Sequence, residues 1–281
     1  MPFICAKFGG TSLATGKRFL NVARIVRSSH ERRLIVVSAP GRRFDGDEKV
    51  TDLLLKYFRT RSEEVWREIR ARFDGILGAD AARAMDRARE SILEFDSEDY
   101  ALSRGEYLSA RAMARLLDFD FVDAASCVRM DKNGRILMRE TEEAIRAVFD
   151  PARGAVIPGF YGADEAGCVR VFPRGGSDIT GAVCARAIGA RLYENWTDVD
   201  GVYDRNPSEP GARLLNALSF DGMRDLVRRG AQVLHPDSLA PVEEKGIPVR
   251  VRNTFRPSAP GTWILPRDLE APDAPKTDKT R

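Results

Sequence analysis

Histidine is almost absent from this chain, with two occurrences in 281 residues. His30 lies among charged residues and His235 precedes a proline, so neither has the partners that a His-based nucleophile relay or a zinc site needs. The four cysteines stand far apart without a C-x-x-C pair. Three of them lie in or near apolar runs, which predicts buried thiols in a reducing compartment rather than a disulfide framework.

The chain also lacks a strong charge of either sign and long apolar runs. Its 45 basic and 42 acidic residues give a net charge of +3, which does not favour binding to nucleic acid or to a membrane surface. No apolar run approaches the ~20 residues that a membrane span needs, and the first residues lead directly into a predicted strand. We therefore predict a cytoplasmic protein with no nucleic-acid or membrane partner.

Two glycine pairs follow predicted strands at distant points of the chain. The first follows the strand Phe3–Phe8, and the second follows the run Cys168–Phe172 in the segment Phe172-Pro-Arg-Gly-Gly-Ser-Asp. Glycines let the backbone approach a bound group closely, and the N–H groups of a helix N-terminus favour an anion. Lys precedes the first pair, and Arg and Asp flank the second. We therefore predict that the two turns form a single site in which two bound anions meet.

The alternative interpretation of both glycine turns is an ordinary capped helix after a loop. A Thr-Ser pair would then cap the first helix, and Ser177 or Asp178 would cap the second. Such turns are common, so neither turn by itself distinguishes the two interpretations.

Strands and helices alternate along the chain, which predicts an α/β three-layer αβα sandwich around a mainly parallel sheet. Arg33–Ser38 is a continuous apolar run, as expected for a strand that is covered on both faces. Ile247–Arg252 is the predicted closing strand, and its Pro248 favours an edge position.

Three further segments connect these strands. Residues 39–49 are rich in glycine, proline and charge and predict a mobile loop. Residues 62–95 predict a helical hairpin that is broken at Asp74–Asp80. Another helix is expected to begin at Gly105, which would place Glu106 in a first turn where the helix dipole favours a carboxylate.

Five motifs occur in an order that resembles the aspartate kinases of the amino-acid kinase superfamily. They are Lys7-Phe-Gly-Gly-Thr-Ser, Arg104-Gly-Glu-Tyr-Leu-Ser, Arg174-Gly-Gly-Ser-Asp, Trp196-Thr-Asp-Val-Asp-Gly-Val-Tyr and Gly230-Ala-Gln-Val-Leu-His-Pro. The resemblance covers residues 2–265 and implies an open αβα sandwich on an eight-stranded sheet. We expect a kinase domain over residues 1–265, with the amino acid in its N-terminal part and the nucleotide in its C-terminal part, and a disordered tail over residues 266–281.

The resemblance implies that ATP phosphorylates the side-chain carboxylate of L-aspartate, the first step of the aspartate-family amino-acid route. A carboxylate with a pKa of about 3.9 is already ionised at neutral pH, so the reaction depends on positioning and positive charge rather than on a general base. By resemblance, Lys7 bridges the γ-phosphate and the attacking oxygen, and Asp178 orients Lys7. Glu106 takes the α-ammonium group of the substrate, and Arg174 takes its α-carboxylate in a bidentate pair.

The resemblance also implies the remaining contacts and the cofactor. Thr51 and Ser177 resemble the neutral donors near the substrate. Mg²⁺ is expected to be held mainly through the nucleotide phosphates, with no residue assigned as a direct metal ligand. The implied nucleotide contacts are Lys7, Phe8, Gly9, Gly10, Thr197, Asp198, Tyr203, Gln232 and Val233.

The chain departs from the family pattern in two respects. Many relatives carry Lys where this chain has Gln232 and Arg where it has Ser208, so two cations expected near the nucleotide are neutral here. Most aspartate kinases also append ACT domains, and none is expected in these 281 residues. Feedback regulation would then need a separate ACT-domain chain, and the resemblance also allows a homodimer.

Two other functions stay open. The same fold could act on another small acid, although Glu106 and Arg174 together favour a free α-amino acid. A non-catalytic nucleotide-binding regulatory subunit would bind ATP without turnover, although the retention of Lys7 and Asp178 argues against it.

Overall fold

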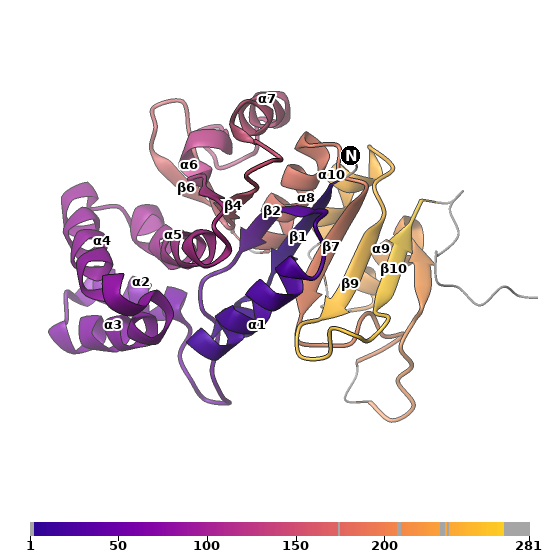
Figure 1. Cartoon of the computed structure of the whole chain (residues 1–281), viewed down its shortest axis with the longest axis horizontal. Helices are drawn as coiled ribbons and strands as arrows, with labels where there is room; N and C mark the ends of the chain where they lie inside the picture. Colours follow the sequence, from indigo (N-terminus) through magenta and orange to yellow (C-terminus); the bar gives the residue numbers. More distant parts are fainter. Residues whose placement is uncertain (1–2, 174, 207–208, 231–233, 235, 267–281) are drawn as a thin grey trace, which may run out of the picture.

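A computed structural model describes residues 3–173, 175–206, 209–230, 234 and 236–266. An eight-stranded sheet in the order β3-β4-β2-β1-β7-β9-β10-β8 runs through its centre (Figure 1). This confirms the predicted α/β fold and the eight-stranded sheet. The strands are β1 (Ile4–Phe8), β2 (Arg32–Val37), β3 (Asp120–Phe121), β4 (Ala155–Pro158), β7 (Leu192–Thr197), β8 (Ala217–Ser219), β9 (Val249–Asn253) and β10 (Thr262–Leu265).

Strand β1 lies between β2 and β7 and is parallel to both. Lys7 is paired with Val36 on one side and with Asn195 on the other. All five residues of β1 are buried, which is typical of a parallel strand covered on both faces. Since β2, β1, β7 and β4 all run in the same direction, their carboxyl ends meet at one edge of the sheet, where open α/β sheets bind ligands.

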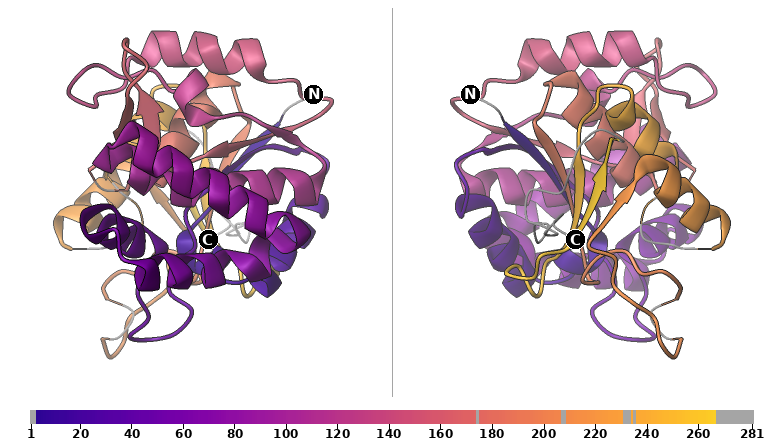
Figure 2. Two further views of the ribbon diagram at one scale, coloured as in Figure 1. Left: turned by 90° about the vertical axis from the view of Figure 1, so that its left-hand side faces the viewer. Right: turned by 90° about the vertical axis from the view of Figure 1, so that its right-hand side faces the viewer.

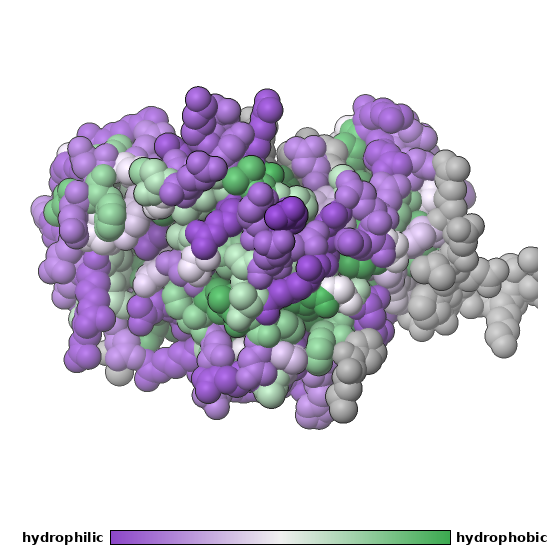
Figure 3. Space-filling model, turned by 90° about the horizontal axis from the view of Figure 1, so that it is seen from above, coloured by the Kyte–Doolittle hydropathy of each residue, from purple (hydrophilic) through white to green (hydrophobic). Residues whose placement is uncertain are grey.

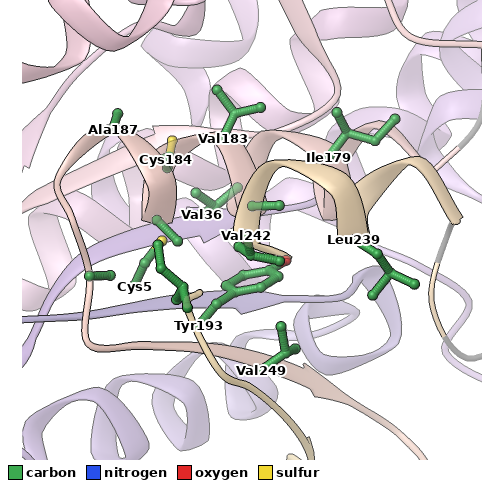
Figure 4. Packing of buried hydrophobic residues seen from close by; sticks show 14 of the residues in the cluster. Cys5, Val36, Ile179, Val183, Cys184, Ala187, Tyr193, Leu239, Val242 and Val249 are labelled. Carbon is green, nitrogen blue, oxygen red and sulfur yellow. The ribbon is translucent and has the colours of Figure 1, made fainter. Parts of the chain in front are cut away.

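Helices cover both faces of the sheet (Figure 2). On one face α8 (Gly176–Ala187) and α10 (Leu239–Glu243) pack on β1, β7 and β9, and the short α6 (Ala124–Cys127) and α7 (Met138–Val148) extend this layer. Figure 4 shows Tyr193 and Val249 of the sheet beneath Val183 of α8. On the other face α1 (Gly16–Arg27) and α5 (Glu98–Leu117) cover Ala6, Phe8 and the neighbouring strand β2.

A helical region beside the sheet has a core of its own. It consists of α2 (Val50–Thr60), α3 (Glu63–Leu77), α4 (Ala81–Phe95) and one side of α5, around Trp66, Ile69, Phe73, Met85 and Ile92. A 3-10 turn, η2 (Gly78–Asp80), separates α3 from α4, so the predicted break of the helical hairpin is confirmed.

The remaining elements are short. The hairpin of β5 (Tyr161–Ala163) and β6 (Val169–Val171) is antiparallel. Helix α9 (Phe220–Arg228) follows β8, and η3 (Pro236–Ser238) precedes α10. Among the described residues no helix is both long and apolar enough to cross a membrane. The face in Figure 3 is mostly hydrophilic, with apolar residues toward its middle.

Three sequence-based predictions about the elements are wrong. The helix carrying Glu106 begins at Glu98, with Ser97 as its N-cap, and not at Gly105. Helix α1 begins at Gly16, after the 3-10 turn η1 (Gly10–Leu13), and Thr15 rather than the Thr-Ser pair caps it. Strand β9 is internal, because β10 adds to it in an antiparallel pair and Pro248 precedes its first residue.

The predicted burial of three cysteines is confirmed. Cys5, Cys127 and Cys184 are buried, whereas Cys168 is exposed. Removal from water raises the pKa of the Cys127 thiol to about 12, and the pKa of Cys184 is also raised by burial. These thiols are therefore protonated and unreactive parts of the core.

Candidate active site

The glycine turn after β1 holds two loops together at the carboxyl edge of the sheet. The backbone N–H of Gly9 donates to the oxygen of Trp196 at 3.0 Å, and that of Gly41 donates to the oxygen of Gly10 at 2.8 Å. A Cβ atom on Gly10 would lie 2.8 Å from the carbonyl oxygen of Ala39. Glycine is required here because the two backbones approach too closely for a side chain.

An ion pair between Lys7 and Asp178 lies directly beside this turn. The Nζ of Lys7 is 2.5 Å from Oδ1 of Asp178, and both side chains are mostly buried. Asn195 donates to the same carboxylate oxygen at 2.8 Å, and the hydroxyl of Tyr193 donates to the backbone oxygen of Asp178 at 3.1 Å. An ammonium group has three N–H donors, so this arrangement fixes the ammonium group of Lys7 and leaves two donors for a ligand.

The N-terminus of α8 contributes the second glycine turn. Helix α8 begins at Gly176, and its N-cap is Gly175 with φ +63°. Ser177 and Asp178 therefore lie inside the first helical turn, and the prediction that one of them is the N-cap is wrong. A Cβ atom on Gly159, just after β4, would lie 2.7 Å from the Oγ of Ser177, so a strand end and the helix start are in close contact.

Phe160 follows Gly159 and has a left-handed backbone, with φ +77°. This conformation costs a bulky residue ~1–3 kcal/mol, and such strained residues cluster at functional sites. The N–H of Phe160 donates to the Oγ1 of Thr180 at 3.2 Å, so α8 holds the strained residue in place.

Glu106 is a buried carboxylate with one free oxygen. Its side chain lies near the middle of α5 and the residue is 4% exposed. It accepts the backbone N–H of Ala39, but its Oε2 is buried and has no hydrogen-bond partner among the described residues. Burial raises the pKa of Glu106 to about 8. The interpretation of Glu106 as a dipole-stabilised carboxylate in a first helical turn is wrong, because α5 begins at Glu98 and Glu106 lies near its middle.

Ala39 connects Glu106 to the glycine turn. Its N–H reaches the carboxylate of Glu106, its oxygen lies against Gly10, and a Cβ atom on Gly105 would be 2.7 Å from its own Cβ. The carboxylate on α5 and the ammonium of Lys7 thus belong to one continuous set of contacts at the carboxyl edge of the sheet.

The loop of residues 39–49, predicted to be mobile, is anchored by a buried arginine that the sequence analysis missed. Arg72 on α3 is 4% exposed and donates to Oδ2 of Asp47 at 2.7 Å and to the oxygen of Gly41 at 2.7 Å. Arg43 also pairs with Asp47, and its hydrogen bonds hold the pKa of that carboxyl well below its usual range. Arg72 stands three residues after the buried Ile69, and this apolar spacing is the sequence signal for its burial.

Three of the predicted nucleotide contacts, Thr197, Asp198 and Tyr203, follow β7 or end it and are less enclosed than Glu106. The side chain of Phe8 is buried and stacks on Trp196 with ring centroids 5.8 Å apart, so only its backbone is available to a ligand. Thr197 donates to the exposed Asp198 at 3.2 Å. Tyr203 forms an isolated bridge with Leu214 and is half-buried.

The structure brings together the predicted residues near β1 and α8 and leaves others untested. Thr51 lies in the first turn of α2 and is partly exposed. Arg174, Gln232 and Val233 lie outside the described residues, as do Ser208 and His235. Among the described residues there is no group of three or more His, Cys, Asp or Glu side chains that could hold a metal ion.

Comparison with known proteins gives the family of the chain. Residues 2–253 match the model of the amino acid kinase family. The chain belongs to this family. This match extends from the residue before Phe3 to the last residue of β9, and so includes every element that builds the site.

Relatives of this amino acid kinase domain include aspartokinase 3 of Bacillus subtilis, which is 34% identical over 92% of the chain. Among solved structures, the aspartate kinase of Clostridium acetobutylicum superposes with a TM-score of 0.87 and is 35% identical over 96% of the chain. E. coli aspartokinase III, solved with aspartate and ADP, gives a TM-score of 0.84 at 26% identity over 95% of the chain. The chain spans 63%, 64% and 65% of these three proteins, respectively.

Two residues of this amino acid kinase domain were not predicted from the sequence. Asn195 shares the carboxylate of Asp178 with Lys7, and Arg72 anchors the loop that carries Ala39. Asn195 directly precedes the motif that begins at Trp196, and its pairing with Lys7 across β1 and β7 is a contact that the sequence alone does not reveal.

Proposed function

We propose that this domain transfers the γ-phosphoryl group of ATP to the side-chain carboxylate of L-aspartate, giving 4-phospho-L-aspartate. The observation that carries the proposal is the buried Glu106, which has a free oxygen and whose carboxylate is linked through Ala39 to the glycine turn beside Lys7. A buried carboxylate of this kind suits the α-ammonium group of an amino acid, and the fixed lysine suits phosphate. The names of the three relatives support aspartate as the acceptor.

Lys7 would counter the repulsion between the two anionic reactants. Its two free N–H donors would bridge the γ-phosphate and the attacking carboxylate oxygen, while Asp178 and Asn195 hold it in position. The backbone N–H groups of Gly9 and Gly10 lie at the same edge, and that of Gly9 is already engaged by Trp196. Gly10 therefore offers the backbone donor, and preorganisation of these groups supplies most of the catalysis.

The substrate would be recognised by its charged α-groups. Glu106 would accept the ammonium group, and Arg174 would pair with the α-carboxylate. Ser177, in the first turn of α8, would add a neutral donor and Thr51, in the first turn of α2, would add another. Both helix N-termini favour an anionic substrate.

The nucleotide would lie on the β7 side. We propose that Thr197, Asp198 and Tyr203 contact it, together with the backbone of Phe8 and with Gln232 and Val233. Mg²⁺ would enter with ATP and be held mainly by phosphate oxygens, where it neutralises negative charge. The residues present suit this arrangement, because Oδ1 of Asp178 is engaged by Lys7 and Asn195 while its second oxygen can accept a metal-bound water.

The decisive experiment measures ADP release with ATP, Mg²⁺ and L-aspartate, with hydroxylamine present to trap acyl phosphate as hydroxamate. We expect hydroxamate with L-aspartate and none with N-acetylaspartate, which lacks the ammonium group. Turnover of L-glutamate at an equal rate would indicate a different acid substrate. ATP binding without any turnover would favour a regulatory subunit and contradict the proposal.

Assembly, regulation and location are proposals of the same kind. We propose a cytoplasmic enzyme that forms a homodimer, which sedimentation equilibrium would test. We also propose a separate ACT-domain chain as a regulatory partner. Clear inhibition of the 281-residue chain by millimolar lysine or threonine in the absence of that partner would contradict this.

A further inference from the structure

A cavity lies on the side of α5 that faces away from Glu106. Its volume is about 780 Å³, and it is bounded by α1, the end of α3, α4 and α5. On α5, Arg104, Leu108 and Arg111 line it, which are residues of one helix face. Glu106 lies on the opposite face of α5. The helix therefore separates the cavity from Glu106.

Arginines line both walls of this cavity. Arg83 and Arg87 are one turn apart on α4, and Arg104 and Arg111 are two turns apart on α5. Within the described part of the chain, none of these four side chains forms an ion pair with a carboxylate. Asp80 and Arg115 also line the cavity and pair with each other, so the other four arginines leave an excess of positive charge, which attracts an anion.

Arg104 is the most informative of the four. It is 4% exposed, and its guanidinium lies 4.0 Å from the ring centre of Tyr100 and 4.4 Å from that of Tyr107. It donates three hydrogen bonds, two to the Oγ of Ser103 and one to the hydroxyl of Tyr100. A guanidinium has five N–H bonds, so two remain, and a buried cation without a counterion is costly.

The other residues that line the cavity indicate which chemical class of anion it can bind. Phe19, Ile76, Leu108 and Ala112 supply apolar surface, and the tyrosines beside Arg104 supply aromatic faces. A volume of about 780 Å³ is within the ~300–1,000 Å³ of small-molecule pockets. The lining therefore suits an apolar or aromatic body with an acidic group directed at the arginines.

We propose that this cavity is a second ligand site, which binds a small organic acid with an apolar or aromatic body. The acidic group lies against Arg104, with Arg83 and Arg87 closing over it from α4. The apolar body packs on the side chains from α1, α3 and α5.

Binding at this site alters the affinity for the amino-acid substrate. This coupling rests on the proposed function. Arg104 is followed directly by Gly105, which packs on Ala39, and by Glu106, which accepts the N–H of Ala39. A ligand that binds Arg104 and shifts it therefore also shifts the turn of α5 that positions Glu106.

Direct binding to the full chain tests the site independently of catalysis. The probes are 2-naphthoate and its neutral analogue 2-naphthamide, measured by isothermal titration calorimetry. Saturating ADP and L-aspartate are present so that the anion sites of the candidate active site are filled. We expect naphthoate to bind about tenfold or more tightly than naphthamide, because only the carboxylate can form charge-assisted hydrogen bonds with arginine.

Matched variants localise the binding. The double variant Arg83→Ser/Arg87→Ser should weaken naphthoate binding about tenfold or more. The control Arg24→Ser/Arg67→Ser removes two exposed arginines that do not line the cavity and should leave binding unchanged. Equal binding of the two probes, equal losses in both double variants, or no binding at millimolar naphthoate would each overturn the site.

Kinetics test the coupling separately. If the chain phosphorylates aspartate, saturating naphthoate should change the KM for aspartate at least about threefold, which is within the usual range of coupling between sites. The Arg83→Ser/Arg87→Ser variant should lose this response while keeping its basal KM. An unchanged KM with naphthoate bound would contradict the coupling but not the binding site. Absence of turnover would contradict the proposed function but not the binding result.

Discussion

The two sides of β1 differ in how completely they are enclosed. On the side of β2 and α5, Glu106 is 4% exposed and contacts a loop that Arg72 anchors. On the side of β7, Asp198 is exposed and Tyr203 only half-buried. A buried carboxylate requires a correctly placed partner of opposite charge, because burying a polar group without a partner costs free energy. On the more exposed β7 side, water can form hydrogen bonds with polar groups such as Asp198.

Gln232 and Ser208, the two neutral replacements, follow β7 in sequence and lie outside the described residues. Around Glu106, Ala39 lies against both Gly105 and Gly10, so these segments are closely packed. We therefore expect substitutions on the α5 side to have larger effects than substitutions on the β7 side.

The largest expected effect is on the residue between the two sides. Lys7→Met should lower kcat by about 10²–10³, the scale for loss of one preorganised electrostatic contact. The matched control is Lys17→Met, an exposed lysine of α1, which should retain wild-type kcat. Circular dichroism would verify the fold of both variants. A kcat within a factor of about three of wild type would contradict the role of Lys7.

The second effect is on stability as a function of pH. Burial raises the pKa of Glu106 to about 8 in the fold, whereas an unfolded glutamate has a pKa of about 4.3. Between these values the native state binds the extra proton, so ligand-free stability should fall as pH rises, by roughly 3 kcal/mol from pH 5 to 8. Urea unfolding of wild type and Glu106→Gln would measure this, because the variant should lack that part of the pH dependence. Parallel pH profiles would contradict it.

The third effect concerns the anchored loop. Arg72→Met should lower the free energy of unfolding by about 2–3 kcal/mol, since Asp47 would keep only its partly exposed partner Arg43. It should also raise the KM for aspartate, because Ala39 would lose its support. Arg67→Met, on the exposed side of the same helix, is the control and should change neither quantity. A destabilised Arg72→Met with an unchanged KM would limit this residue to a structural role.

The fourth effect separates the two sides directly. Glu106→Gln should raise the KM for aspartate about 10- to 100-fold, the loss of a charge-assisted hydrogen bond, while the KM for ATP stays within about twofold. Glu98→Gln, at the exposed start of the same helix, is the control. Equal changes in the two KM values would show that Glu106 does not select the amino acid.

The smallest effect is expected on the open side. Asp198→Asn should raise the KM for ATP by about fivefold or less, because an exposed charge contributes ~0.2–1 kcal/mol. The KM for aspartate should not change. A loss of more than about fiftyfold would mean that the β7 side is enclosed when nucleotide binds, and the contrast between the two sides would fail.

Local patterns predicted much of the fold correctly. The buried run around Leu34–Val37 and the broken helical hairpin follow from apolar spacing and glycine positions. The errors and omissions lie where local signals are weak. Helix α5 begins seven residues before the predicted start at Gly105, and β8 and β10, which were not predicted individually, are short strands that pair across a long sequence separation.

The sequence by itself determined the family, the sheet and the residue types of the site, because motif order and strand periodicity are local properties. Tertiary structure alone decided that Glu106 is buried with a free oxygen, that Asn195 shares the carboxylate of Asp178 with Lys7, and that Arg72 anchors the loop. Burial and pairing arise from contacts between distant segments, and these contacts set the pKa of Glu106 and the free donors of Lys7.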